Sequence, residues 1–78
     1  MDGKYIVEED KEIVRQSFLE AGMDTARTLW TLEYRVHSEN NSILYIINHA
    51  MFIRDKNGKT VRVIGAITDI TERKRAGA

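Results

Sequence analysis

Apolar and polar side chains alternate over residues 28–37, and this pattern predicts a β-strand with one buried face. Trp30, Leu32, Tyr34 and Val36 make the apolar side, and Thr31, Glu33, Arg35 and His37 make the polar side. Residues 38–42 then form a polar cluster, in which Asn40 and Asn41 tolerate the positive φ angle of a tight hairpin. A strand that ends in a turn is therefore expected here.

Two further strands are expected over residues 43–54 and 60–70, joined by Asn57-Gly58, a strong hairpin signal. Both carry apolar residues on both faces, which is unusual for a sheet with one side in water. In the last strand Val61, Val63 and Ile67 share one face, and Ile64, Ala66 and Ile70 share the other. Gly65 between them predicts a bulge or a close backbone approach.

The residues before the strands have a helical period over Glu8–Ala21. The face that would be buried consists of Ile13, Val14, Ser17, Phe18 and Ala21. Acidic residues in the first turn suit the helix dipole, and Gly22 is expected to end the helix in a left-handed conformation. Residues 4–7 are expected to form either a short strand or a lead-in loop. Thr71 is expected to cap a short final helix.

The expected fold class is α+β: one helix followed by a three-stranded antiparallel meander. Residues 1–78 are expected to form a single domain, in which residues 71–78 begin a connector helix. A lone helix covers one face of such a sheet, so the apolar side chains of the second face need another cover. Burying one Leu- or Ile-sized side chain contributes about 1.5–3 kcal/mol, which is a large share of the stability of a small domain.

A second copy of the chain is the expected cover for these side chains. The candidate dimer interface consists of Tyr45, Ile47, Val61, Val63, Ile64, Ala66 and Ile67. The alternative is a twisted sheet that stays partly exposed, since folded surfaces are commonly more than half apolar.

Composition narrows the expected function. The 78 residues include no Cys, so neither a disulfide nor a thiolate zinc site is expected. Lys and Arg total 12, as do Asp and Glu, which argues against a nucleic-acid partner because such a protein needs a basic surface. No apolar run approaches the ~20 residues that a membrane span needs. No membrane partner is expected, and the expected location is the cytoplasm.

No residue pattern points to catalysis or to a metal site. Ser, His and Asp occur without a nucleophile–base spacing, and a Gly-rich phosphate loop is missing; the chain is therefore not expected to be an enzyme. His37 lies on a polar strand face and is expected to be solvated. His49 shares a face with Tyr45 and Ile47, so packing or an interface is expected there, with pH sensing as the alternative.

Residues 62–76, RVIGAITDITERKRA, resemble the closing segment of PAS sensor domains, which is called the PAC motif. In that family the last strand runs through an Asp-Ile-Thr tripeptide into a signalling helix, and Asp69-Ile70-Thr71 match the tripeptide. Residues 32–36 resemble the antepenultimate strand, residues 54–58 resemble the final hairpin turn, and residues 9–12 resemble the start of the preceding helix.

The chain departs from the family pattern in two ways. The first hairpin carries Asn40-Asn41 where the family often has Asp-Gly. The chain is also expected to lack the first two strands of a PAS domain. Because the last strand of that fold pairs with the first, the outer edge of residues 60–70 is expected to be unpaired, and a free apolar edge is a template for another chain.

The resemblance implies a signal-transduction module, as in two-component systems, that relays a change in sheet packing to an output helix. The implied relay residues are Asp69, Ile70, Thr71 and Arg73, with Asp69 bracing the junction against Arg73. The implied partner is a parent output domain such as a histidine kinase or a cyclic-nucleotide enzyme. The family's flavin photoreceptors need a reactive Cys, and its haem-binding members use a His on the helix before the strands. This chain has no Cys, and residues 8–21 include no His, so no cofactor is expected.

Two other functions stay open. In the first, the apolar faces line a small-molecule pocket within one chain or between two. In the second, Trp30 and Tyr34 act as stacking platforms for single-stranded nucleic acid, although packing in the core or in an interface is the expected role of both. The neutral net charge counts against the second function.

Overall fold

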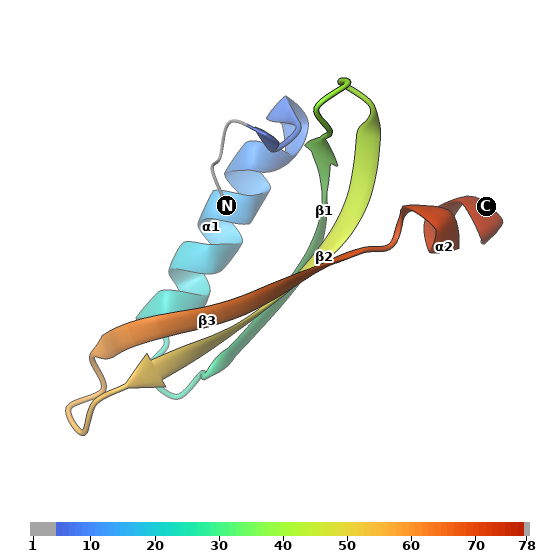
Figure 1. Cartoon of the computed structure of the whole chain (residues 1–78). Helices are drawn as coiled ribbons and strands as arrows, with labels where there is room; N and C mark the ends of the chain where they lie inside the picture. Colours follow the sequence, from blue (N-terminus) through green and yellow to red (C-terminus); the bar gives the residue numbers. More distant parts are fainter. Residues whose placement is uncertain (1–4, 78) are drawn as a thin grey trace.

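A computed structural model describes residues 5–77. Its elements in chain order are α1 (Glu8–Met23), β1 (Leu29–His37), β2 (Ile43–Arg54), β3 (Thr60–Asp69) and α2 (Thr71–Ala76). The strands form one antiparallel sheet in the order β1–β2–β3; α1 lies along one side of it, and α2 extends away beyond the end of β3 (Figure 1). The α+β fold class expected from the sequence is confirmed.

Both hairpins use a residue in the left-handed region, as the turn sequences predict. Asn41 has a φ of 66° in the first hairpin, and Gly58 has a φ of 84° in the second. The sheet register pairs Tyr34 with Ile46, and Ile46 with Asp69. All the even-numbered side chains of β1 therefore share a face with the even-numbered side chains of β2.

Gly65 marks a close backbone approach and not a bulge. A Cβ atom at this position would lie 3.3 Å from the carbonyl oxygen of His49, and the β2–β3 register is continuous there. The register shift lies between Ile53 and Arg54, next to the hairpin.

The end of α1 differs from the expectation. The helix runs through Gly22 to Met23, and Gly22 does not have a positive φ. The physical reason is that Arg54 supplies the cap: its guanidinium donates to the carbonyl oxygens of Gly22 and Ala21, both at 3.4 Å, and of Asp24 at 3.0 Å. A side chain from β2 satisfies carbonyls that a left-handed glycine would otherwise satisfy.

The lead-in to α1 joins the sheet at one point. Ile6 forms an isolated antiparallel bridge with Val36, and the Val7 N–H donates to the Arg35 carbonyl oxygen at 3.0 Å. Residues 4–7 were expected to form a short strand or a lead-in loop. Lys4 lies outside the described residues.

The core lies between α1 and the even-numbered face of β1 and β2. Its buried members are Val14, Ala21, Trp30, Tyr34, Val36, Ile46, Ala50 and Phe52. The helix packs on these two strands, whereas every residue from Val61 to Asp69 in β3 is exposed. The expectation that one helix covers a whole face of the sheet is therefore wrong, because α1 is too narrow to reach β3.

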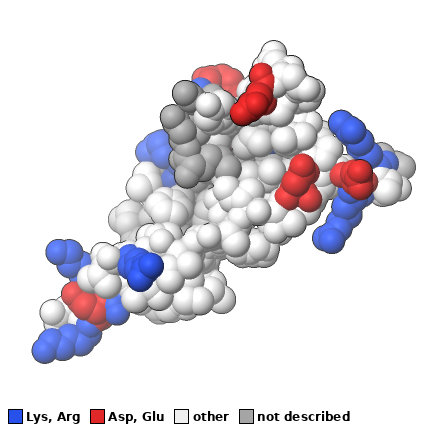
Figure 2. Space-filling view, in the orientation of Figure 1, with Lys and Arg blue, Asp and Glu red and all other residues white. Residues whose placement is uncertain are grey.

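Charged side chains gather toward the ends of the face seen in Figure 2. Basic and acidic groups lie together at the β2–β3 hairpin and again at α2, while mostly uncharged side chains cover the middle. The side chains of this face are therefore mostly uncharged where β3 crosses it, as Figures 1 and 2 together indicate.

Candidate functional site

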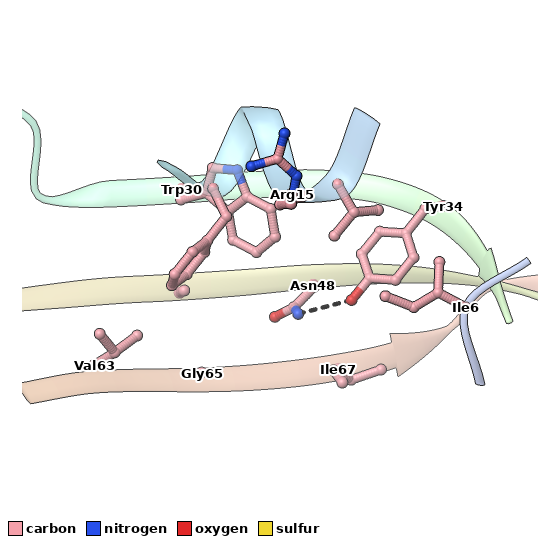
Figure 3. A pocket seen from close by; sticks show the side chains of 11 residues that line it. Ile6, Arg15, Trp30, Tyr34, Asn48, Val63, Gly65 and Ile67 are labelled. Carbon is pink, nitrogen blue, oxygen red and sulfur yellow. Dashed lines mark hydrogen bonds between the residues drawn. The ribbon is translucent and has the colours of Figure 1, made fainter. Parts of the chain in front are cut away.

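A groove with a volume of about 490 Å³ lies between α1 and the sheet. Its floor is the middle of β2, its closed wall is formed by α1 and β1, and its other side is β3 (Figure 3). Apolar side chains line most of it, among them Val14, Phe18, Trp30, Ala50, Val63 and Ile67. Its volume is within the ~300–1,000 Å³ typical of small-molecule pockets.

Aromatic packing holds the closed wall in place. The Phe18 ring meets the Trp30 ring edge-on, with centroids 5.2 Å apart and an interplanar angle of 85°, and it lies 5.6 Å from the Phe52 ring. The indole N–H of Trp30 donates to the Ser17 hydroxyl at 2.9 Å. Trp30 and Tyr34 are buried core residues, as the sequence predicts, so they are not free stacking platforms for bases.

Polar groups of three kinds also face the groove. The Asn48 amide donates to the Tyr34 hydroxyl at 3.0 Å, in the centre of the view in Figure 3. The Arg15 guanidinium lies at the wall formed by α1, where its ion pair with Glu12 raises its pKa. The groove thus offers an amide, a phenol and a cation within a mainly apolar surface.

A second cluster connects β3 with α2. The Ile70 N–H donates to the Tyr45 carbonyl oxygen at 2.8 Å, and the Tyr45 N–H donates to the Thr71 hydroxyl oxygen at 2.9 Å. The Thr71 side chain thus takes the place of a strand carbonyl, which continues the β2–β3 ladder after the backbone has turned into a helix. Ile70 and Thr71 are both buried.

Asp69 braces this junction, but its partner is Thr71. The Asp69 carboxylate accepts the Thr71 N–H at 2.8 Å and the Thr71 hydroxyl at 2.5 Å. These bonds lower the pKa of Asp69, and the charge of Arg75 lowers it further. The contact with Arg73 implied by the family resemblance is therefore replaced by a contact with Thr71.

The capping role expected for Thr71 is also wrong. Thr71 is the first residue of α2, and the N-cap position is Ile70, which makes no side-chain capping bond. The reason is that the Thr71 hydroxyl is engaged with Tyr45 and Asp69. One ion pair connects α2 with the sheet: Lys74 binds the carboxylate of Glu33 on β1.

His37 differs from the sequence-based expectation, whereas the interface role expected for His49 stays a prediction. The His37 side chain is half-buried, and its Nδ1 atom is buried without a hydrogen-bond partner. Its cross-strand neighbour is the apolar Ile43, which explains why this side chain is only partly solvated. His49 is exposed within the single chain, where its Nδ1 atom lies 3.2 Å from the Thr31 hydroxyl.

The candidate interface residues lie on both faces of the sheet. Tyr45, Ile47, Ile64 and Ala66 are on the face turned away from α1, and Val63 and Ile67 are on the face with the groove. The β3 members are widely exposed, at 60% for Val61, 45% for Val63, 49% for Ile64 and 46% for Ile67. Tyr45 and Ile47 are half-buried. The feature common to the exposed members is that they belong to β3.

Several residues of these sites escape sequence reasoning. Glu33 and Arg54 act through partners more than ten positions away in the chain, so no local pattern points to them. The helical period places Ser17 on the buried face, but it does not indicate the bond to Trp30. Asn48 has a visible signal: it is the polar residue among the otherwise apolar even positions from Leu44 to Phe52.

Within residues 5–77, no group of three or more His, Asp or Glu side chains is placed to hold a metal ion. None of the helices in this part of the chain has the length and apolar character needed to cross a membrane.

Comparisons with known proteins agree with this geometry. A family model described as the PAS fold matches residues 3–67. The chain is similar to a solved sensory box histidine kinase/response regulator from Burkholderia thailandensis, with a TM-score of 0.77 and 27% identity, covering 95% of this chain and 55% of that one. It is also similar to the PAS domain of a protein from Colwellia psychrerythraea, with a TM-score of 0.72 and 25% identity, covering 91% and 58%.

A third structure, the PAS domain of a GGDEF family protein from Chromobacterium violaceum, shares the fold, with a TM-score of 0.53 and 17% identity, covering 85% of this chain and 59% of that one. The chain thus spans a little over half the length of these solved structures. None of the curated proteins matches it.

Proposed function

The chain belongs to the PAS-fold family, and on that premise we propose that it is a signal-transduction module that relays changes in sheet packing into α2. The observation that carries this proposal is the bond from the Tyr45 N–H to the Thr71 hydroxyl. It makes the first residue of α2 a hydrogen-bond partner of β2, the strand that also floors the groove. A change at the groove therefore has a short covalent and hydrogen-bonded route to α2.

The route can be followed residue by residue. Ala50 lies in the groove floor, and Tyr45 lies on the same strand at the junction with α2. Asp69, Ile70 and Thr71 make the turn, and Lys74 with Glu33 holds α2 to β1. Arg73 is exposed on α2, where it is available to whatever follows the helix. We propose that α2 begins the connector to an output domain.

The proposed output partner is a histidine kinase or a cyclic-nucleotide enzyme. The similarity to a sensory box histidine kinase/response regulator and to a domain of a GGDEF family protein supports this choice. The proposed mode of action also includes self-association through the sheet, which is supported by the exposed apolar side chains of β3. Analytical sedimentation at a protein concentration of tens of micromolar tests that part of the proposal. A dimer is expected, and a folded monomer would contradict it.

The relay itself is tested with a packing change in the groove floor. Ala50→Val adds two methyl groups to β2, and we expect amide resonance shifts to extend through Tyr45 to the helix amide of Lys74, which donates to the Ile70 carbonyl oxygen. Combining it with Thr71→Val should reduce the shifts in α2, because the side-chain bond between the strand and the helix is then missing. Lys56→Ala at the exposed hairpin tip is the control. Unchanged α2 resonances in Ala50→Val would refute the relay.

A second candidate function is small-molecule binding in the groove. The volume of about 490 Å³ and the few polar groups on a mainly apolar lining favour it. Native mass spectrometry of the purified chain, followed by denaturing mass spectrometry, tests it: a copurified compound that is released on denaturation supports binding. Trp30, the single tryptophan, lies against the groove, so its fluorescence should change when such a compound is removed.

A further inference from the structure

The direction in which α2 points depends on few contacts. Its first residue, Thr71, is buried, whereas residues 72–77 are exposed. A helix of this length is not stable by itself, so contacts outside the helix decide where it points. We propose that the ion pair between Lys74 and Glu33 is an electrostatic latch that sets the direction of α2, and that the charge at Glu33 controls it. The inference rests on the proposed relay and adds a form of regulation to it.

The ion pair reaches across β2. The sheet register pairs Glu33 on β1 with Ile47 on β2, and Ile47 with Thr68 on β3. Lys74 belongs to the helix that follows β3 (Figure 1), and its ammonium group binds the Glu33 carboxylate. The pair therefore ties α2 to β1, a strand that is not next to β3 in the sheet.

Helical spacing explains why Lys74 is the residue that makes this contact. Ile70 and Thr71 are buried against the sheet, and Lys74 follows them by four and three residues, which places all three on one face of the helix. The Lys74 N–H donates to the Ile70 carbonyl oxygen at 3.0 Å, so this helical turn is formed. Of the three basic residues of α2, Lys74 alone forms a salt bridge within residues 5–77.

Other bonds secure the hinge about which α2 would turn. The Thr71 hydroxyl accepts the Tyr45 N–H at 2.9 Å and donates to the Asp69 carboxylate at 2.5 Å. Neither bond includes Lys74, so both persist when the ion pair opens. Residues at the ends of elements commonly absorb such a change in direction. Opening the latch therefore lets α2 turn about Ile70 and Thr71 while the junction with β3 stays intact.

The strength of the ion pair suits a latch that can open. The side chains of Lys74 and Glu33 are 46% and 38% exposed, and ion pairs with such exposure are weak, so the latched position is favoured by up to about fivefold. Two positions with populations of similar size respond to small perturbations. A charged group of a partner that binds either side chain is then sufficient to redirect α2.

Paramagnetic broadening of amide resonances tests the latch, because the chain has no Cys and accepts a single nitroxide label. Ala76→Cys places the label on the exposed last residue of α2. In the latched position we expect it to broaden the β1 amides around Glu33. Glu33→Gln removes the charge with little change in shape, so the broadening should fall by roughly a third, and Glu33→Lys should lower it further.

Two more measurements separate charge from shape. In the labelled chain the broadening should decrease between about 0.01 M and 1 M NaCl, because the Debye length falls from roughly 30 Å to 3 Å. In Glu33→Gln it should not depend on salt. Glu33→Lys combined with Lys74→Glu should recover the broadening that Lys74→Glu alone loses. Glu39→Lys makes the same change in charge at an exposed residue of the first hairpin and is the control that should keep the broadening.

The outcomes distinguish the latch from the relay. Equal broadening in Glu33→Gln and in the labelled chain at low salt would overturn the latch, while α2 shifts in Ala50→Val would still support the relay. A double variant with no more broadening than Lys74→Glu alone would mean that the aliphatic part of Lys74 places α2, which would also overturn the latch. Salt-dependent broadening without α2 shifts in Ala50→Val would support the latch and refute the relay from the groove.

Discussion

At the turn from β3 into α2, the hydrogen bonds of a single side chain fix the direction of the backbone. The Thr71 hydroxyl accepts a hydrogen bond from the Tyr45 N–H and donates one to the Asp69 carboxylate, so one side chain serves both the last rung of the sheet and the turn into α2. A buried N–H without a partner costs free energy comparable to a lost hydrogen bond. The identity of residue 71 is therefore set by the end of the sheet and not by the start of the helix.

We expect Thr71→Val to lower the free energy of unfolding by about 1–2 kcal/mol. Valine keeps the shape of the side chain but leaves the Tyr45 N–H without its acceptor. Thr71→Ser keeps the hydroxyl and is the matched control, with a smaller loss. Urea denaturation measures both variants, and equal stability of Thr71→Val and the unmodified chain would contradict the role assigned to this hydroxyl. In the same variant the pKa of Asp69 should rise toward its ordinary value, because its largest cause of lowering is the bond from Thr71.

At the scale of elements, α1 is attached to the sheet at both ends by polar contacts. Near its start Asp10 accepts the Arg35 N–H at 2.9 Å and pairs with the Arg35 guanidinium at 2.7 Å. At its end the Arg54 guanidinium donates to the carbonyl oxygen of Asp24 and, at 2.9 Å, to that of Arg27. Its Nη1 atom also donates to the Thr60 hydroxyl at 2.7 Å. Arg54 thus joins the helix end, the loop before β1 and the start of β3.

Arg54→Lys should lower the melting temperature, because an ammonium group cannot reach the carbonyls that the planar guanidinium bridges. The loss of several of these hydrogen bonds predicts a decrease in stability of about 1–3 kcal/mol. Arg73→Lys on the exposed face of α2 is the control and should stay within about 0.5 kcal/mol of the unmodified chain. Thermal melts followed by circular dichroism compare the two variants, and an equal effect of both would argue against a clamp at Arg54.

At the scale of the whole molecule, the fold is an asymmetric two-layer structure. The core joins α1 to β1 and β2, while β3 is held by β2 and is exposed along its length. Apolar packing alone therefore fixes only part of the molecule, and the ion pair between Asp10 and Arg35 contributes to holding the layers together. Because the bond to Arg35 lowers the pKa of Asp10, the stability of the whole chain should depend on pH.

The sign of this dependence follows from the lowered pKa. The Asp10 contribution is complete above the unfolded pKa of about 4 and is lost as the pH falls through the lower folded pKa. Asp10→Asn should therefore be less stable than the unmodified chain at pH 7, by about 1 kcal/mol because the Arg35 side chain is partly exposed. The difference should shrink as the pH falls below about 4. Urea titrations at several pH values measure it, and a difference that does not depend on pH would contradict this role.

The elements themselves were predictable from local patterns. The alternation of apolar residues in β1, the apolar runs of β2 and β3, and the turn residues Asn41 and Gly58 identify three strands and two hairpins with bounds within one residue of those observed. The groove was less predictable, because Phe18, Trp30 and Asn48 come together from three different elements. Errors arose where a distant side chain replaced a local signal, as Arg54 does at the end of α1.

The sequence by itself determined the periodicity of each segment, the positions of the turns and the excess of apolar side chains on the last strand, because all of these depend on neighbours along the chain. Only the tertiary structure decided which groups satisfy the ends of the helices, that α1 stops short of β3, and that the Thr71 hydroxyl completes the sheet. The physical reason is that a hydrogen bond or a packed contact between distant residues depends on how the elements are oriented, and local propensity carries no information about that orientation.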